Sequence, residues 1–405
     1  MAVQHYIIKL FDRPLAAFDY VCEGRNPAYA CNLEIDPAAQ HLLPMNLAAE
    51  ATDDELGRFL NSRRIPKNRA YAEEILRPCG VSLDDTKGII DLTKGASIND
   101  SYLVVAENDP VTFSECNLFE NDFNVALQIA AYSGVVSRDA LEAHGMPSEL
   151  TASGQFPKAW RIVAGKRVLY KAGSTSMRTQ RRLEPHSEYL ACQVADAMGI
   201  PHVSYGLTTW RGELCSTCEL MNTAATSFVP LYAAVPRREI ARMGLDRALE
   251  FFFGISPADS TAFLTMLAFD VAIANKDRHF GNYGVLRDNL SGEVLGFAPI
   301  FDHNMALFCA EPDEAFTREG LTAAEHRYAS AFGSDLFGQF DDVVEKTQAE
   351  RLAALADFEF SLPGEFVAYA RENPDAPDAF PASRLEALSA FVRFTATRKR
   401  SRRPR

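Results

Sequence analysis

The chain has 405 residues, 47% of them hydrophobic and 23% charged, with a formal net charge of −13. This length exceeds the usual size of one hydrophobic core, so we expect a globular protein of two or more subdomains. The negative charge argues against direct nucleic-acid binding, and the lack of any apolar run of about eighteen residues argues against a membrane-spanning helix. The start reaches charged residues too soon for a signal peptide, which predicts a cytoplasmic protein.

Cysteine usage agrees with that compartment. The eight cysteines form no dense framework, which in a chain this long indicates reduced thiols. Cys215 and Cys218 have the spacing of a metal or redox pair, but they fall in a predicted strand, where residues three apart point to opposite faces. Two packed thiols are therefore the preferred interpretation.

Residues 1–149 are predicted to form an accessory or docking region, because they contain no catalytic spacing. The stretch 5–21 predicts two strands around the turn sequence Asp-Arg-Pro, and 53–62 and 69–80 predict short helices. The segment 93–134 then combines a strand, an aromatic loop and an apolar helix.

Residues 150–222 predict a small lobe in the order strand, strand, helix, strand, strand. A loop of small residues leads into AWRIV, the turn AGK and the returning strand RVLYK. Because an antiparallel hairpin brings the chain back to its start, Lys171 is expected near the loop at 152–158. Backbone N–H groups beside an ammonium suit phosphate.

A helix and two strands complete this lobe. Ser187 is predicted to cap a helix over 188–198, which a glycine and a proline would end. The strands are predicted at 202–210 and 212–221.

Residues 223–397 are predicted to be mainly helical, followed by a basic tail at 398–405 that is expected to be solvated. One β-hairpin interrupts the helices, with strands at 283–287 and 293–300 around the turn sequence DNLSG. Helices are predicted at about 237–252, 260–275, 322–331, 343–356 and 382–399.

This hairpin brings polar residues together. Asn282 precedes the outgoing strand and Asp302 follows the returning one, so antiparallel pairing places both at one end, next to Asp277. Oxygen ligands of this kind hold Mg²⁺ in phosphoryl transfer, which predicts Asn282 and Asp302 as metal ligands. Asp277 is placed to orient or deprotonate an attacking hydroxyl. Lys171 would then contact the nucleotide phosphates, with Glu188 as its ion-pair partner.

The sequence motifs in these segments resemble those of a known family. The motif Asp277-x-His279-x-x-Asn282, with IFD ending at Asp302, resembles the catalytic and metal-binding segments of the HipA-like serine/threonine kinases, and DRHFGN is also similar to the corresponding loop of phosphatidylinositol kinases. Upstream, ASGQFPKAW resembles the family's phosphate loop, VLYK its lysine strand, and CELM lies where its hinge would meet adenine. The resemblance covers about residues 150–330 well.

The resemblance implies an α+β, two-lobed protein-kinase-like fold, with a small β-rich lobe, a mainly helical lobe and an N-terminal accessory region. It implies that ATP and Mg²⁺ bind between the lobes. The γ-phosphoryl group would pass to a serine or threonine hydroxyl of a protein substrate, with Asp277 and His279 as catalytic residues. The nucleotide-binding residues implied by the family's motifs are Ser153, Gly154, Gln155, Lys158, Lys171, Glu188, Glu219, Leu220 and Met221.

Two properties of the family concern partners and regulation. Toxin members are restrained by a DNA-binding antitoxin, so an antitoxin-like or regulatory protein is a partner class that the resemblance suggests. Some members phosphorylate themselves in the phosphate loop, where Thr151 and Ser153 are the matching hydroxyls. The N-terminal region aligns only weakly with the family, through its opening hairpin.

Other interpretations of these residues stay open. Asp277 could cap a turn and Asn282 could start the hairpin. His279 suits a structural hydrogen bond better than proton transfer, and Glu188 could be a charge favoured at a helix N-terminus. Asp270, in an apolar helix, either bonds the catalytic loop or faces a polar neighbour. A lipid or small-molecule kinase would share the same residues, and a catalytically inactive nucleotide-binding module is the other alternative.

Overall fold

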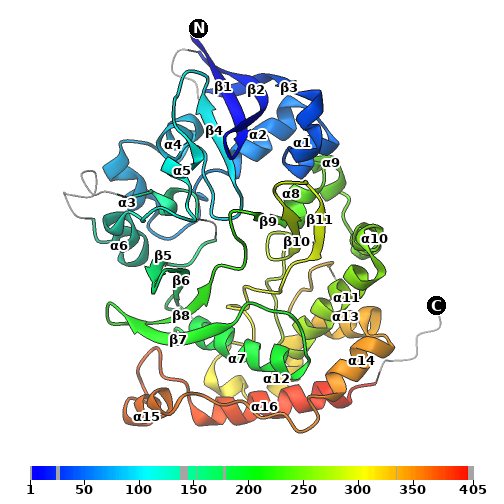
Figure 1. Cartoon of the computed structure of the whole chain (residues 1–405). Helices are drawn as coiled ribbons and strands as arrows, with labels where there is room; N and C mark the ends of the chain where they lie inside the picture. The colour runs from blue at the N-terminus through cyan, green and yellow to red at the C-terminus, as the bar shows by residue number, and fades with distance from the viewer. Residues whose placement is uncertain are drawn as a thin grey trace. The chain divides into compact units, whose positions relative to one another are not determined.

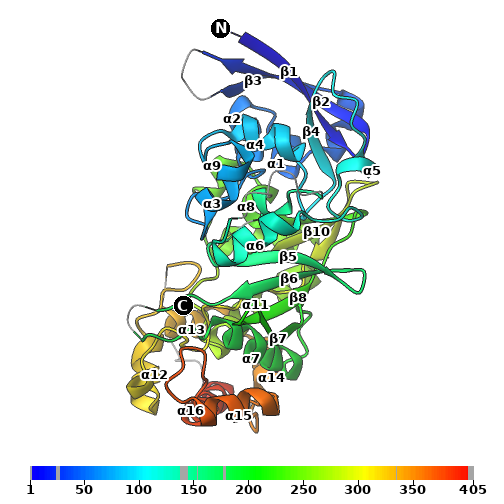
Figure 2. The same cartoon turned by 90° about the vertical axis from the view of Figure 1, so that its left-hand side faces the viewer.

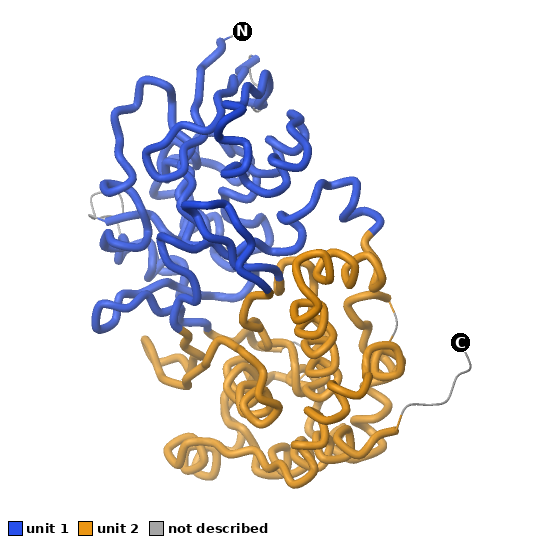
Figure 3. Tube along the Cα trace, turned by 45° about the vertical axis from the view of Figure 1, so that its right-hand side comes forward, with its two compact units in different colours: residues 1–171, 219–242, 284–296 blue, residues 172–218, 243–283, 297–405 orange. Residues whose placement is uncertain are grey.

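The computed structural model describes residues 2–23, 28–136, 145–152, 154–176, 179–333 and 335–399. The chain divides into two compact units, each made of segments that are far apart in sequence (Figure 3). Helices and strands occur in both units, as predicted, and no helix within the described ranges is both long and apolar enough to cross a membrane. Unit 1 comprises residues 1–171, 219–242 and 284–296, and unit 2 comprises residues 172–218, 243–283 and 297–405.

Unit 1 begins with a four-stranded antiparallel sheet in the order β3-β2-β1-β4 (Figures 1 and 2). The hairpin of β1 and β2 confirms the two strands predicted over 5–21. On β1, Tyr6, Ile8 and Leu10 are buried, and the residues between them are less so, as the period of two in a strand requires. The strands are β1 (Ala2–Leu10), β2 (Arg13–Cys22), β3 (Tyr29–Ile35) and β4 (Tyr102–Ala106).

Short helices supply the other half of this core. Tyr6 and Phe18 of the sheet share one buried cluster with Leu56 and Phe59 of α2. The α2 helix begins where the side chain of Thr52 accepts a hydrogen bond from a backbone N–H of the first turn, which confirms the helix predicted there. The helices of this part are α1 (Met45–Ala49), α2 (Asp53–Asn61), α3 (Ala72–Leu76), α4 (Thr86–Thr93), α5 (Phe113–Cys116) and α6 (Val125–Ser133).

Two further hairpins belong to unit 1. Strands β5 and β6 pair antiparallel with Lys158 opposite Lys171, which confirms the predicted hairpin and the position of Lys171 beside the loop. Strands β9, β10 and β11 form a second sheet in the order β11-β10-β9, and β10 and β11 are the hairpin predicted around DNLSG. The elements are β5 (Lys158–Val163), β6 (Lys166–Ala172), β9 (Thr226–Pro230), α8 (Leu231–Ala234), α9 (Arg237–Ile240), β10 (Gly284–Asp288) and β11 (Val294–Phe297).

The buried helix α11 (Pro257–Ala272) is central to unit 2, where it contacts α7, α10, α13, α14 and α16. Phe263 of α11 and Phe252 of α10 are fully buried and stack with ring centroids 4.9 Å apart. The other elements are α7 (Glu184–Ala197), β7 (Tyr205–Trp210), β8 (Glu213–Glu219), α10 (Leu245–Ile255), α12 (Arg318–Glu325), α13 (Leu336–Val343), α14 (Lys346–Ala353), α15 (Gly364–Glu372) and α16 (Ala382–Thr397).

The prediction of Ser187 as a helix cap is wrong. The α7 helix begins at Glu184, with a proline in its first turn, where the missing N–H of proline costs no helical hydrogen bond. Ser187 therefore lies inside the helix, and its hydroxyl bonds the backbone carbonyls of His303 (2.7 Å) and Ala306 (2.9 Å).

Several predicted helix boundaries also differ from the structure. The helix predicted at 237–252 is two helices, α9 and α10, and α10 begins after Gly244 in an extended conformation. The helix predicted at 343–356 corresponds to the shorter α14, α13 was not predicted, and α12 begins earlier than predicted. The α15 helix was not predicted.

Candidate functional site

The loop after α11 carries the candidate catalytic residues. Ala274 adopts a left-handed backbone conformation (φ 49°), which ends the helix. The N–H of Asn275 then bonds the Asp270 carbonyl (2.8 Å). The Asn275 carboxamide donates to Asp270 Oδ1 (2.9 Å) and accepts from the Asp277 N–H (3.1 Å). These bonds replace the helical ones lost at the turn, so Asp277 leaves α11 in a fixed direction.

Arg278 ties this loop to the segment before Asp302. Its guanidinium forms a bidentate ion pair with Asp270, both contacts being 2.9 Å, and both side chains are 1% exposed. The same guanidinium donates to the carbonyls of Asn282 and Phe301, each at 2.8 Å. Burial lowers the pKa of Arg278, but Asp270 outweighs it and leaves the pKa raised. One buried cation therefore holds both segments that carry the predicted metal ligands.

The side-chain contacts of Asn282 leave its carboxamide oxygen available. Its side-chain nitrogen donates to the Asp277 carbonyl (3.1 Å), which leaves the carboxamide oxygen without a donor among the described contacts. Asp302 has a φ of 61°, a conformation that asparagine and aspartate adopt more readily than other side chains. Its N–H donates to the hydroxyl of Tyr205 (3.2 Å), so the backbone on which the carboxylate stands is fixed.

Asp277 and Asp302 are close enough to influence each other's charge. Although the Asp277 side chain is exposed on one side, surrounding protein raises the pKa of its carboxyl. His279 and Arg278 lower this pKa, whereas the Asp302 carboxylate raises it. The structure thus gathers Asp277, Asn282 and Asp302 in one neighbourhood of unit 2.

His279 makes a structural contact in the same loop. Its Nδ1 accepts a hydrogen bond from the Gly281 N–H (3.0 Å), while the ring is exposed. Backbone bonds from His279 to Asp277 (3.0 Å) and from Asn282 to His279 (2.8 Å) close the turn between them. These contacts favour the interpretation of His279 as a residue that shapes the loop.

The donor set of the neighbourhood suits Mg²⁺. Magnesium prefers hard oxygen ligands and is commonly held by one or two protein groups together with waters and substrate phosphates. Asn282 and Asp302 supply two such oxygens. Within the described ranges no group of three or more His, Cys, Asp or Glu side chains could hold a metal. A magnesium ion at Asn282 and Asp302 would therefore complete its shell with water and phosphate oxygens.

Glu188 lies on α7 of the same unit. Its side chain is fully buried, and the Ser216 hydroxyl of β8 donates to its carboxylate. A carboxylate favoured only by the helix N-terminus could stay in water, whereas burial requires hydrogen-bond or charge partners. The burial of Glu188 thus argues against the simpler interpretation of it as a surface helix charge.

The candidate phosphate loop belongs to unit 1. Gly154 has a φ of 87°, and any Cβ built there would clash with the ammonium of Lys158. Glycine adopts this conformation without strain, and a larger residue would also displace the Lys158 ammonium. Lys158 and Lys171, opposite each other on β5 and β6, are 7% and 5% exposed. Two ammonium groups are therefore largely shielded from water at one end of the hairpin.

Three other loop residues differ in accessibility. Gln155 is exposed, and Thr151 is buried with its hydroxyl bonded to the Ser148 carbonyl (3.2 Å). Ser153, predicted both as a nucleotide contact and as a phosphorylation site, lies outside the described residues.

The candidate hinge lies at the end of β8. Glu219 forms an exposed ion pair with Lys166 (2.7 Å), and the Leu220 N–H donates to the Arg167 carbonyl (3.0 Å). Met221 is partly exposed. Because the Leu220 N–H is already bonded, an adenine base would have to contact other backbone groups of this stretch.

The predicted site residues thus form two groups, one in each unit. Gly154, Gln155, Lys158, Lys171, Glu219, Leu220 and Met221 belong to unit 1, and Glu188, Asp277, His279, Asn282 and Asp302 belong to unit 2.

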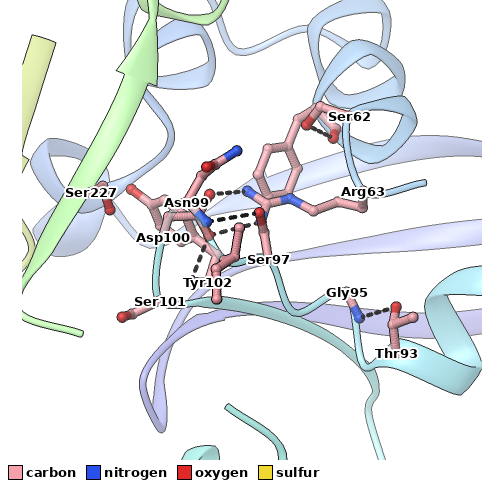
Figure 4. Close-up of polar contacts among 12 residues, drawn as sticks. Ser62, Arg63, Thr93, Gly95, Ser97, Asn99, Asp100, Ser101, Tyr102 and Ser227 are labelled. Carbon is pink, nitrogen blue, oxygen red and sulfur yellow. Dashed lines mark hydrogen bonds and ion pairs between the residues drawn. The ribbon is translucent and has the colours of Figure 1, made fainter. Parts of the chain in front are cut away.

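Sequence reasoning missed the buried arginines that support these segments. Besides Arg278, Arg69 pairs with Glu149, and Arg63 pairs with both oxygens of Asp100 at 2.7 and 2.8 Å (Figure 4). The one signal available was the charge of Asp270 in an apolar helix, which the structure explains through its bonds to Arg278 and Asn275.

Comparisons of this sequence with protein-family models and with curated proteins find no match. Among solved structures, the chain is similar to HipA of Shewanella oneidensis MR-1, solved with HipB and operator DNA, at 11% identity and a TM-score of 0.57 over 96% of each chain. It also matches the Helicobacter pylori proinflammatory kinase CtkA at 17% identity and a TM-score of 0.46, over 60% of this chain and 88% of that one. The chain therefore has a HipA-like fold, as its motifs predicted.

Proposed function

We propose that this chain is a HipA-like, Mg²⁺-dependent kinase that transfers the γ-phosphoryl group of ATP to a serine or threonine hydroxyl of a protein. The observation that carries the proposal is the neighbourhood of Asp277, Asn282 and Asp302. There one carboxamide oxygen is left available, one carboxylate stands on a fixed backbone, and a third group faces solvent. Phosphoryl transfer needs chiefly this positioning and charge neutralisation.

Each residue receives one role in this proposal. Asn282 and Asp302 would hold the magnesium ion, which neutralises phosphate charge when bound. Asp277, exposed and with a raised pKa, would orient the acceptor hydroxyl and take its proton. Lys171 and the loop at 154–158 would bind the phosphates, and Glu188 would orient Lys171.

We also propose a role for each part of the chain and a class of partner. Residues 150–222 would form the nucleotide-binding lobe, with its hinge at 219–221, and residues 223–397 the helical lobe. Residues 1–149 would be an accessory region. The similar HipA was solved with the antitoxin HipB and operator DNA, which supports an antitoxin-like protein as a partner class to test.

Transfer from labelled ATP tests the proposal directly. Purified protein is incubated with labelled ATP and Mg²⁺, alone and with a cell extract, and the labelled residue is mapped. We expect label on serine or threonine with the wild type and none with Asp277→Asn. Because Asp277 is exposed, the free energy of unfolding of this variant should lie within about 0.5 kcal/mol of the wild-type value. Asp246→Asn, at an exposed position of α10, is the matched control and should keep full activity.

Three outcomes would contradict parts of the proposal. Label that persists in Asp277→Asn removes the role of that residue. Label on a lipid or a small molecule replaces the protein acceptor. Stabilisation of the wild type by Mg–ATP without any transfer indicates an inactive nucleotide-binding module.

A further inference from the structure

Three carbonyls of the candidate phosphate loop accept hydrogen bonds from two consecutive residues of the N-terminal region. Arg69 donates to the carbonyls of Ala152 and Lys158, both at 2.9 Å. The N–H of Ala70 donates to the Gln155 carbonyl at 2.7 Å. The loop is therefore held at its beginning, its middle and its end.

A buried carboxylate fixes the guanidinium that makes these contacts. Arg69 pairs with Glu149 at 2.8 Å, and both side chains are 0% exposed. The other carboxylate oxygen of Glu149 accepts from the Trp160 N–H (2.9 Å), just after the loop. Burial raises the pKa of Glu149 and lowers the pKa of Arg69, and each partner opposes the shift of the other. Such a pair is costly to bury, and the further hydrogen bonds of Arg69 and Glu149 offset part of that cost.

The segment that carries Arg69 is itself anchored. It connects α2 to α3, and near its start Arg63 is held by Asp100 and lies over the ring of Phe59, 4.3 Å from its centroid (Figure 4). Arg64 donates to the Leu83 carbonyl at 2.7 Å. The connection therefore offers Arg69 a rigid support within unit 1.

We propose that Arg69, held by Glu149, is a positioning residue for the nucleotide phosphates, an inference that rests on the proposed function. A trans peptide directs its N–H away from its C=O, so the Gln155 carbonyl, drawn toward Ala70, turns the N–H of Phe156 the opposite way. Oriented N–H groups of this kind bind phosphate. The connection between α2 and α3 thus belongs to the nucleotide site, although the sequence assigned it to an accessory region.

Arg69→Lys tests this role, with Arg63→Lys as the matched control. Both substitutions keep the charge and remove guanidinium hydrogen bonds to a carboxylate at a buried position of the same connection. Only Arg69 contacts the loop. In the nucleotide-free protein, we expect the Ala70 amide, which donates to the Gln155 carbonyl, to exchange hydrogen about tenfold faster in Arg69→Lys than in the wild type or Arg63→Lys.

Nucleotide binding is the second measurement. We expect Arg69→Lys to raise the Kd and KM for Mg–ATP at least about tenfold, with a smaller change in kcat, because the loop loses its bound geometry. Arg63→Lys leaves the contacts between Arg69 and the loop in place, so it should raise both constants much less than Arg69→Lys does. If Arg69→Lys does not fold, the double variant Arg69→Met with Glu149→Gln removes both buried charges, keeps an acceptor for Trp160 and still lacks the donors to the loop.

The possible failures are distinguishable. A wild type that binds Mg–ATP, with a variant that binds it equally well or shows unchanged amide exchange, overturns the role of Arg69 alone. Equal losses in Arg69→Lys and Arg63→Lys also overturn it, because they indicate a general loosening of the connection. A wild type that binds no Mg–ATP overturns the proposed function and this role together.

Discussion

At the scale of single residues, the backbone of Asp302 decides which substitution tests its role. Its φ of 61° is strained for alanine but accessible to asparagine, so Asp302→Asn removes charge without adding backbone strain. If Asp302 holds magnesium, this variant should need roughly tenfold more Mg²⁺ for the same stabilisation by ATP. The measurement is the melting temperature with ATP across a Mg²⁺ titration.

A second substitution separates ligand loss from general damage. Asn282→Ala removes the available carboxamide oxygen and the bond to the Asp277 carbonyl, so it should raise the Mg²⁺ requirement in the same direction. Stabilisation by ADP without metal should be unchanged in Asp302→Asn. A Mg²⁺ requirement equal to that of the wild type would remove Asp302 from the metal site.

At the scale of elements, Arg278 connects α11 to the two segments that carry Asn282 and Asp302. Arg278→Lys cannot bond both Asp270 oxygens and the two carbonyls at once, so we expect a loss of about 3 kcal/mol in stability. At a temperature where the variant is still folded, its rate of phosphoryl transfer should nevertheless be lower than that of the wild type, because both segments that carry the predicted metal ligands lose their support.

Arg398→Lys is the control for that comparison. Arg398 also forms a bidentate pair, with Glu325, both contacts being 2.7 Å, in the same unit but without a described contact to the catalytic loop. The Arg398→Lys variant should have a lower free energy of unfolding than the wild type, but its rate of phosphoryl transfer per folded molecule should be unchanged. Equal losses of transfer in the two variants would show that Arg278 has only a general structural role.

The elements that the sequence predicted correctly are those with local signals. Turn sequences such as Asp-Arg-Pro, and alternating apolar residues, sufficed for the hairpins of β1–β2, β5–β6 and β10–β11. The start of α7 was misplaced because a serine cap was preferred to the proline of the first turn. Short helices such as α8 depend on tertiary packing and left no periodic pattern to find.

The residues of the candidate site likewise differ in how well the sequence could predict their positions. Asp277, Asn282 and Asp302 could be placed together because a short motif and a hairpin fix their spacing. Arg69 and Glu149 could not, since they lie 80 residues apart and a buried ion pair has no periodic signature. Such partners become visible only when the fold brings distant segments into contact.

At the scale of the whole molecule, the segments of unit 1 depend on one another. Arg287 of β10 is 5% exposed and donates to the Leu43 carbonyl (2.7 Å) and to the Tyr102 hydroxyl (2.9 Å). A chain of residues 150–405 would leave this buried cation with the Gly292 carbonyl (2.8 Å) as its one described partner. Removing residues 1–149 would expose this buried side of β10 to water and take away those hydrogen bonds, so we expect this fragment to aggregate or to be degraded rapidly by protease. A chain ending at residue 399 should resist protease like the full chain, and a stable 150–405 fragment would contradict this dependence.

His186 should make the stability of the molecule depend on pH. It is 1% exposed, packs its ring against Phe380 with the ring centroids 5.0 Å apart, and its Nδ1 has no hydrogen-bond partner among the described residues. Burial lowers the pKa of His186 to about 4, from an ordinary value of 6.5. Between these values the unfolded chain binds a proton that the folded chain does not, so the stabilising effect is complete above pH 6.5 and is lost as pH falls toward 4.

The variant His186→Leu isolates this contribution. Over that range the wild type should lose up to about 3 kcal/mol that the variant keeps. Buried Glu184, whose pKa burial raises, acts in the opposite direction in both proteins, so the difference between their melting temperatures at pH 7.5 and pH 5 is the informative quantity. We expect the wild type to lose more on acidification than His186→Leu. Parallel losses would mean that the pKa of His186 is nearly the same in the folded and unfolded chains, which would contradict the effect of burial.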